Sequence, residues 1–416
     1  MMDWKLLLAQ RIYSSGDDGG RSVSRPAVRI AVCGIAAGLA VMILSVAVAM
    51  GFKHQVRDMV TGLSAEVLVT SMDAAQSYQM TPVEAGDSLR DAMRGVKGVK
   101  NVQRFSTKPG MIMTEDNFMG MVLKGIASDY DLAYLRRHLE EGEIPAFSDT
   151  VSTNSVIVSR MIADRLKVGV GDRLYTYYVE EDLRARRLTV SGIYSTNFTA
   201  FDEIFLVTDL YTVNRLNNWK HNQVSGLEVS VDDYARLDSV NGALRSLLLD
   251  MEDSSGSQYY TRTIEDVYPQ IFAWLDLLDL NVWVILLLMT GVAGFTMISG
   301  LLIIILERTQ MIGTLKALGA DDSSIRNVFL TFSAFVVGRG MVWGDVMGLA
   351  VCAVQGIFKV LRLDPATYYI DYVPVEFNVG LFLALNVATL VVSLAMLVGP
   401  SYLVCRISPV KTMRFE

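Results

Sequence analysis

The chain has 416 residues, of which 51% are hydrophobic, and its mean hydropathy of +0.34 is high for a water-soluble protein. Its net charge of −7 and its pI near 5.2 argue against a nucleic-acid partner, because such partners are bound by clustered basic residues. The three cysteines lie in or beside apolar runs and the three histidines are isolated, so their spacing indicates neither a disulfide framework nor a metal site.

Four apolar runs reach the length of about 20 residues that a membrane-spanning helix needs. These runs are 30–52, 282–306, 328–354 and 379–404. We therefore predict an integral membrane protein with spans at 28–52, 280–306, 326–355 and 379–405. The first run is longer than the 7–15 apolar residues of a signal peptide, so we expect an uncleaved anchor.

Basic residues flank the first span on its N-terminal side, the connection after the second span and the C-terminal tail. With four spans these three segments share one side, and the excess of basic residues predicts that this side is cytoplasmic. The cytoplasmic parts would be 1–27, which includes an amphipathic helix at 3–13, together with 307–325 and 406–416. The region 53–279 and the loop 356–378 would lie outside.

The large region 53–279 has the composition of a globular domain and mixes strand and helix patterns. This mixture predicts an α+β domain, with a possible inserted module at 127–222. Two β-rich runs, 173–179 and 186–194, flank a charged tip and predict a hairpin.

Small residues recur at every fourth position in two of the spans. They are Gly34 and Gly38 in the first span, and Gly340, Gly344 and Gly348 in the third. This spacing favours close packing between helices. Arg339 and Asp345 lie in the third span and predict a polar cavity, a neighbouring helix or a second protomer beside them. A proton or ion path is the alternative, although arginine does not release its proton at ordinary pH.

The polar connection between the second and third spans has its own amphipathic pattern. Met311, Leu315 and Leu318 fall on one face of a helix. Gly319 is a natural helix stop, and Asp321 is a natural cap for the next helix. We predict a short helix at the membrane surface. The alternative is a structured turn that binds nothing.

The sequence contains no G-x-x-x-x-G-K-[ST] loop, no G-x-S-x-G and no H-E-x-x-H motif. The chain is therefore not expected to hydrolyse ATP or to be an enzyme, and we expect it to bind no cofactor or metal. What remains is a surface helix, four spans and a tethered domain, a set that fits a device passing motion across a membrane.

Several segments resemble a known family. The residues Glu307-Arg308, Ile312-Gly313 and 315–320 are similar to the coupling segment of FtsX/MacB-type ABC permeases. The tail 407–416 resembles their common ending I-x-P-x-x-x-L-R-x-E, with Met413 in place of leucine. The stretches 25–53 and 191–202 look like lipoprotein-releasing permeases of the LolC/LolE type.

The resemblance implies a mechanotransmission fold with one span before the external domain and three after it. It implies a separate LolD-like ATPase that binds ATP and Mg and docks on the coupling helix. It also implies a second permease protomer, the same chain or a homologous one. ATP-driven closure would then release a lipoprotein from the outer leaflet of the inner membrane to a LolA-like periplasmic carrier.

The residues expected to contact the ATPase are Glu307, Arg308, Met311, Ile312, Gly313, Leu315, Lys316, Leu318 and Gly319. Those expected to contact the lipoprotein, besides membrane lipids, are Val41, Leu44, Val48 and Phe52, each of which could equally be an ordinary lipid- or helix-facing residue. The candidate hook for the carrier is the hairpin tip, Glu180, Glu181, Asp182, Leu183 and Arg184, although an acidic loop tip is often only solvated.

Two other functions remain open at this point. A MacB-like export permease usually carries a fused N-terminal ATPase. An FtsX-like regulator transports nothing, activates a cell-wall hydrolase, and usually has a much smaller external domain.

Overall fold

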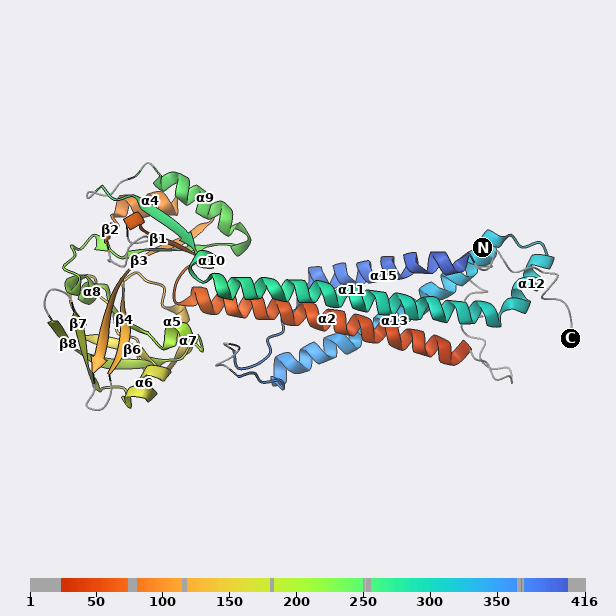
Figure 1. The fold of residues 1–416 in the computed structure, drawn as a ribbon, viewed down its shortest axis with the longest axis horizontal. Coiled ribbons are helices and arrows are strands. Elements are labelled where there is room, and N and C mark those ends of the chain that lie inside the picture. Colours follow the sequence, from red (N-terminus) through yellow and green to blue (C-terminus); the bar gives the residue numbers. More distant parts are fainter. Residues whose placement is uncertain are drawn as a thin grey trace. The chain divides into compact units, whose positions relative to one another are not determined.

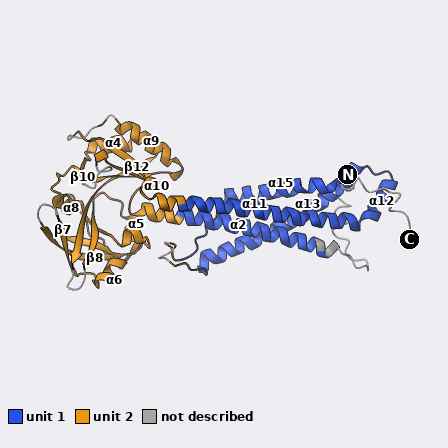
Figure 2. Cartoon of the chain, in the orientation of Figure 1, with its two compact units in different colours: residues 1–54, 274–362, 372–416 blue, residues 55–273, 363–371 orange. Residues whose placement is uncertain are grey.

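The computed structural model describes residues 24–73, 81–113, 118–179, 183–249, 251, 256–364, 368 and 370–402. The chain divides into two compact units, coloured separately in Figure 2. Unit 1 consists of residues 1–54, 274–362 and 372–416, and unit 2 of residues 55–273 and 363–371. The predicted helix at 3–13 and the tail motif at 407–416 lie outside the described residues.

The long helices of unit 1 run alongside one another, and a short helix lies at one end of them (Figure 1). The long helices are α2 (Ser24–Gly62), α11 (Pro269–Glu307), α13 (Asp322–Phe358) and α15 (Val379–Ser401), and the short one is α12 (Thr309–Ala317). Among the described residues, all of these except α12 are long and apolar enough to cross a membrane. Both α2 and α11 continue into unit 2.

Helix α2 continues ten residues beyond the predicted end of the first span, through a segment that contains charged residues. The segment stays helical because Val56, Met59 and Val60 keep the spacing of an apolar face, and all three are at most 5% exposed. At the other junction, Thr263 and Asp266 form a capping box on the short helix α10 (Ile264–Val267). Helix α11 then begins at Pro269, whose fixed φ suits a first helical position.

The repeated small residues lie where helices of unit 1 approach most closely. A Cβ placed at Gly34 would meet Thr296 of α11 at 3.0 Å, and one at Gly38 would lie 3.8 Å from Ala293. The three glycines of α13 face α2 instead. At Gly344 an added Cβ would lie 2.9 Å from both the Ala36 carbonyl oxygen and the Leu39 Cβ.

Gly340 and Gly348 repeat this contact one turn to either side. A Cβ on Gly340 would lie 2.8 Å from the Ile35 Cβ, and one on Gly348 would lie 3.2 Å from the Ile43 Cβ. Glycine at these positions therefore lets the backbones of α2 and α13 approach closely.

We expect Gly344→Ala to lower the thermal stability of the detergent-solubilised protein, at a cost of about 1–3 kcal/mol for overpacking. Gly338→Ala on the same helix is the matched control, because an added Cβ there meets no atom within 4 Å. That change should be neutral or stabilising, since alanine is the better helix former. Equal melting temperatures for the two variants would contradict the close packing of α13 against α2 at Gly344.

Unit 2 is an α+β domain around a ten-stranded mixed sheet (Figure 1). Its strands run in the order β12-β1-β11-β3-β4-β9-β6-β8-β5, and β7 pairs with both β3 and β8. The bounds are β1 (Val67–Ser71), β3 (Val99–Met113), β4 (Phe118–Ile126), β5 (Leu139–Gly142), β6 (Ser155–Ser159), β7 (Arg173–Val179), β8 (Leu183–Tyr194), β9 (Phe205–Asp209), β11 (Gly226–Val231) and β12 (Tyr259–Thr263). A separate two-stranded sheet pairs β2 (Val83–Glu84) with β10 (Gln223–Val224).

Because β7 links β3 to β8, the strands β3, β4, β9, β6, β8 and β7 form a closed ring of pairings. Besides α10, the helices of unit 2 are α4 (Asp87–Arg94), α5 (Ala133–His138), α6 (Arg160–Leu166), α7 (Thr199–Asp202), α8 (Leu210–Leu216), the 3₁₀ turn η1 (Tyr234–Arg236) and α9 (Leu237–Leu248).

Unit 2 has two hydrophobic cores, and the long strand β3 contributes to both. Val102 belongs to the core formed with α4, α9 and the strands at the β12 end of the sheet. Ile112, farther along the same strand, belongs to a second core that strands of the ring form with α6 and α8. The second core also contains Met121 and Leu123 of β4. The second core therefore includes residues before 127, where the inserted module was predicted to begin. The sequence pattern shows no boundary there, because the strand β3 runs through both cores without a break.

Candidate coupling helix and apolar groove

The predicted short helix between the second and third long helices is present as α12. Arg308 separates it from the end of α11 at Glu307. At its other end the amide of Gly319 donates to the Lys316 carbonyl at 3.0 Å, and the Ala320 amide donates to the Leu315 carbonyl at 2.9 Å. Gly319 has a φ of 89°, so this is a Schellman cap that requires the left-handed conformation glycine adopts without strain.

The cap fixes how α12 meets α13. Asp321 occupies the position before α13 but makes no side-chain capping bond. Instead the Lys316 ammonium forms an ion pair with Asp322 at 2.8 Å, and the Lys316 side chain is only 10% exposed. Two helices joined by a tight cap and a partly shielded ion pair form a rigid corner.

One face of α12 packs onto unit 1 and the other faces outward. Ile312 is fully buried in the hydrophobic core that also contains Phe329 of α13, Gly313 is also buried, and Met311 and Leu315 pack partly on the same core. Leu318 is 80% exposed. The outward-facing residues of this corner are Glu307, Gln310, Thr314, Ala317, Leu318 and Gly319.

The residues predicted to contact the ATPase differ in their exposure. Met311 and Leu315 are partly buried and pack against the core of unit 1, whereas Leu318 is exposed. Leu318 lies beyond the last helical residue and turns away from them. The outward face also includes Gln310, Thr314 and Ala317, which the sequence pattern did not single out. Their exposure follows from the packing of the opposite face of α12 against unit 1, which the sequence does not show.

A groove runs between α2 and α11 in unit 1, with a volume of about 350 Å³. Its lining is almost entirely apolar and consists of Leu44, Ser45, Val48, Ala49, Phe52, Leu278, Asn281, Val282 and Ile285. The volume lies within the range of about 300–1,000 Å³ typical of ligand sites. The groove contains three of the four residues predicted to contact an acyl chain, and Val41, which is 38% exposed, is not among its lining residues.

Aromatic and charged contacts lie at one end of this groove. Phe52 packs edge-on against Trp274, with ring centroids 5.2 Å apart. One residue farther along α2, the Lys53 ammonium donates to the Asp279 carboxylate of α11 at 2.6 Å. An apolar groove with a charged pair at its end suits a molecule with a hydrocarbon tail and a polar head.

The α11 half of the groove could not be found from the sequence. The run that contains Val282 and Ile285 is apolar on every side, so no periodicity distinguishes the residues that line a groove from those that face lipid.

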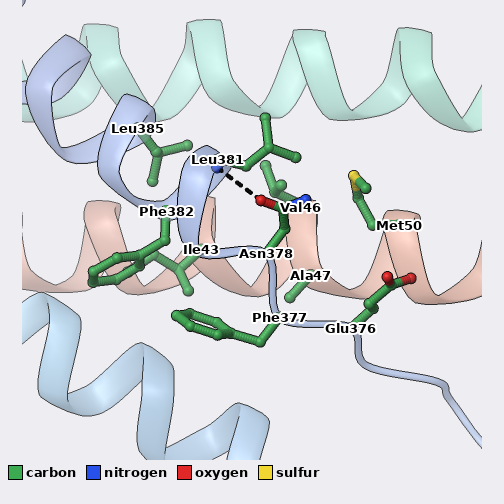
Figure 3. Close-up of a pocket in the computed structure, with 10 residues that line it drawn as sticks. All are labelled: Ile43, Val46, Ala47, Met50, Glu376, Phe377, Asn378, Leu381, Phe382 and Leu385. Carbon is green, nitrogen blue, oxygen red and sulfur yellow. Dashed lines mark hydrogen bonds between the residues drawn. The ribbon is translucent and has the colours of Figure 1, made fainter.

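A second pocket in unit 1 lies beside α2, α15 and the segment before α15 (Figure 3). Asn378 caps α15 there by accepting the amide hydrogens of Gly380 and Leu381 at 2.9 and 3.2 Å. The Glu376 amide donates to the Ala47 carbonyl oxygen of α2 at 3.0 Å. The pocket measures about 20 Å³, close to the space of a single water, so it does not compete with the groove as an acyl site.

The predicted hairpin in unit 2 is formed by β7 and β8, whose register runs from Arg173 opposite Thr189 to Val179 opposite Leu183. Its second strand begins at Leu183 rather than at residue 186. The tip residues Glu180, Glu181 and Asp182 lie outside the described residues.

The two described members of the candidate hook differ in their surroundings. Leu183 is 67% exposed. Arg184 donates to the Leu216 carbonyl at 3.0 Å and to the Asn218 side chain at 2.8 Å, so it ties β8 to the end of α8.

Arg339 and Asp345, the two charged residues of α13 singled out in the sequence, have different surroundings. The Asp345 carboxylate accepts a hydrogen bond of 3.1 Å from Asn386 of α15, which links these two helices. Arg339 is exposed on the surface of unit 1. Within the described part of the chain, no group of three or more His, Cys, Asp and Glu side chains could hold a metal ion.

The fold defines a class of membrane protein with four spans, an α+β domain between the first two, and a short helix between the second and third. Family models agree with this division. One described as a MacB-like periplasmic core domain matches residues 30–247, and one described as an FtsX-like permease C-terminal region matches residues 283–409. The first covers more than half of the chain, so the protein belongs to the MacB-like periplasmic core domain family. The predicted fold class is thereby confirmed.

Curated relatives match along nearly the whole chain. The lipoprotein-releasing system transmembrane protein LolC of Xylella fastidiosa (strain 9a5c) is 19% identical over 407 residues, which cover 92% of this chain and 93% of the relative. The corresponding LolE of Haemophilus influenzae is also 19% identical, over 403 residues, with the same coverage. The resemblance to LolC/LolE-type and FtsX/MacB-like proteins seen in the sequence is confirmed.

Solved structures match only part of the chain. The periplasmic region of MacB from Actinobacillus actinomycetemcomitans is 12% identical, with a TM-score of 0.34, and the match covers 49% of this chain and 91% of that one.

Proposed function

We propose that the chain is the membrane subunit of an ABC transporter that releases lipoproteins from the outer leaflet of the inner membrane to a soluble periplasmic carrier. A separate ATPase, docked on the outward face of α12, binds ATP and Mg and supplies the energy. A second permease protomer completes the complex. The observation that carries this proposal is the apolar groove between α2 and α11, in a chain similar along its length to LolC and LolE.

The physics of lipid extraction supports this division of labour. Each buried methylene holds a lipid anchor in the bilayer by about 0.8 kcal/mol, so ten of them contribute about 8 kcal/mol. Extraction therefore needs both an energy source and an apolar surface that receives the chain. The groove provides the apolar surface, and the exposed residues around Leu318 provide a surface on which an ATPase can bind and exert force.

The test is reconstitution of the protein in liposomes with its cognate ATPase, a triacylated lipoprotein and a soluble carrier. ATP should transfer the lipoprotein to the carrier, and a non-hydrolysable analogue should not. Intact ATP turnover without transfer would reject the proposal.

The proposed topology places both termini and α12 in the cytoplasm and unit 2 in the periplasm. In a background with Cys33, Cys352 and Cys405 replaced by alanine, we expect Val170→Cys to react with a membrane-impermeant thiol reagent in spheroplasts. Leu318→Cys should react only after the membrane is permeabilised. Both positions are exposed, at 45% and 80%. Labelling of both cysteines in intact spheroplasts would contradict the proposed topology, in which unit 2 and α12 lie on opposite sides of the membrane.

A further inference from the structure

The outer end of α2 belongs to unit 2 rather than to the other long helices of unit 1. Its final turns bury Val56, Met59 and Val60, and the helix ends at Gly62. Three elements of unit 2, namely β4, α5 and η1, contribute side chains that hold this end.

The first contact is made by a buried charge. Lys124 of β4 donates from its ammonium to the Leu63 carbonyl oxygen at 2.6 Å, directly after the last helical residue. The C-terminal end of a helix carries partial negative charge and carbonyl groups without helical partners, so an ammonium there satisfies both. The Lys124 side chain is 6% exposed.

The same ammonium forms an ion pair with Glu228 of β11 at 2.6 Å, and the Glu228 side chain is 3% exposed. The other carboxylate oxygen of Glu228 accepts a hydrogen bond from the Tyr130 hydroxyl. Burial and the neighbouring Glu228 carboxylate raise the pKa of the Tyr130 phenol well above its usual value, so Tyr130 remains a donor. The network thus joins the helix end to two strands of the central sheet.

Two further contacts restrict sideways movement. Gly62 lies so close to the Tyr134 ring of α5 that any Cβ would overlap it. One turn and a half earlier, the Arg57 guanidinium lies over the Tyr234 ring at 3.5 Å from its centroid. Tyr234 is itself fixed by its hydroxyl, which donates to Glu265 at 2.7 Å.

A buried ion pair contributes little net stability compared with an apolar pair of the same shape, because desolvation of the charges offsets their attraction. Its directional contacts do fix geometry, and here they fix the end of a long helix to the middle of a sheet. We infer that Lys124, oriented by Glu228, is a positioning residue that joins the end of α2 to the central sheet, so that displacement of α2 moves the α+β domain. This inference rests on the proposed function, because it specifies where the motion passes from span to domain.

The variant that tests the contact between Lys124 and the end of α2 is Lys124→Met, which approximately keeps the length of the side chain and removes its hydrogen-bond donor. In the reconstituted complex we expect ATP turnover within twofold of wild type and lipoprotein release reduced at least tenfold. The amides of residues 57–63 should exchange with deuterium at least tenfold faster. Lys124→Met/Glu228→Gln removes both charges together, leaves no uncompensated carboxylate, and should show the same pattern if the single variant assembles poorly.

The matched control is Arg104→Met. Arg104 of β3 and Asp149 form an ion pair of similar burial, with side chains 9% and 12% exposed, that joins the sheet to a loop rather than to α2. This control should keep release and leave exchange at 57–63 unchanged. Equal loss of release in the control, or wild-type release and exchange in both Lys124 variants, would overturn the inference. Absence of release by the wild-type protein would instead reject the proposed function. The exchange of residues 57–63 would still test whether Lys124 holds the end of α2.

Discussion

Leu318→Asp is expected to detach the ATPase and to abolish ATP-driven lipoprotein release, while the protein still folds and inserts. Leu318 is 80% exposed and lies after the last residue of α12, so its replacement removes no core packing. The loss of a side chain that is a hot spot at the centre of an interface costs about 2 kcal/mol or more, which corresponds to roughly a 30-fold loss of affinity. A pull-down of the ATPase from detergent extracts would measure the loss.

The control for this experiment is Leu249→Asp, which places the same charge on a leucine of unit 2 that is 67% exposed. It should retain the ATPase. A double change that included Leu315 would be less informative, because Leu315 packs against the core of unit 1 and its loss would weaken the fold as well. Full retention of the ATPase by Leu318→Asp would show that the docking surface lies elsewhere.

Ala49→Phe should block the groove and reduce lipoprotein release at least tenfold, with the ATPase still bound and ATP still hydrolysed. Ala49 lines the groove, and a phenyl ring there would occupy part of its volume of about 350 Å³. The change adds no charge to the membrane, so insertion is not penalised. Release of a triacylated lipoprotein from liposomes is the measurement.

Ala37→Phe is the matched variant on the same helix. Ala37 is exposed and is not among the residues that line the groove, so the added ring should leave release unchanged. If both variants lost release equally, the effect would come from disturbed helix packing, and the groove would have no special role.

The corner at α12 shows where reasoning from sequence succeeds and where it stops. The helix and its stop at Gly319 follow from local signals, namely the spacing of apolar residues and a glycine able to adopt positive φ. Which side of the helix is free does not follow, because Met311, Leu315 and Leu318 are equally apolar. Only the packing of Met311, Ile312 and Leu315 against the core of unit 1 shows that Leu318 is the one left exposed.

The groove and the ion pair between Lys124 and Glu228 also could not be predicted from the sequence in full, because each depends on residues that are far apart in the chain. Leu44, Val48 and Phe52 could be chosen because they share one face of a recognisable span. Their partners on α11 could not, since that helix is apolar all round. The pair Lys124 and Glu228 is separated by 104 residues and leaves no pattern that a local reading detects.

The sequence by itself determined four membrane spans, an α+β domain between the first two, the short helix after the second and the family resemblance. Each depends on the length of an apolar run, on local periodicity or on a contiguous motif. The tertiary structure alone decided which face of α12 is open, where α2 and α11 leave a groove, and how the end of α2 is held by Lys124. These depend on distances between residues far apart in the chain, which are set only when the helices and the sheet pack together.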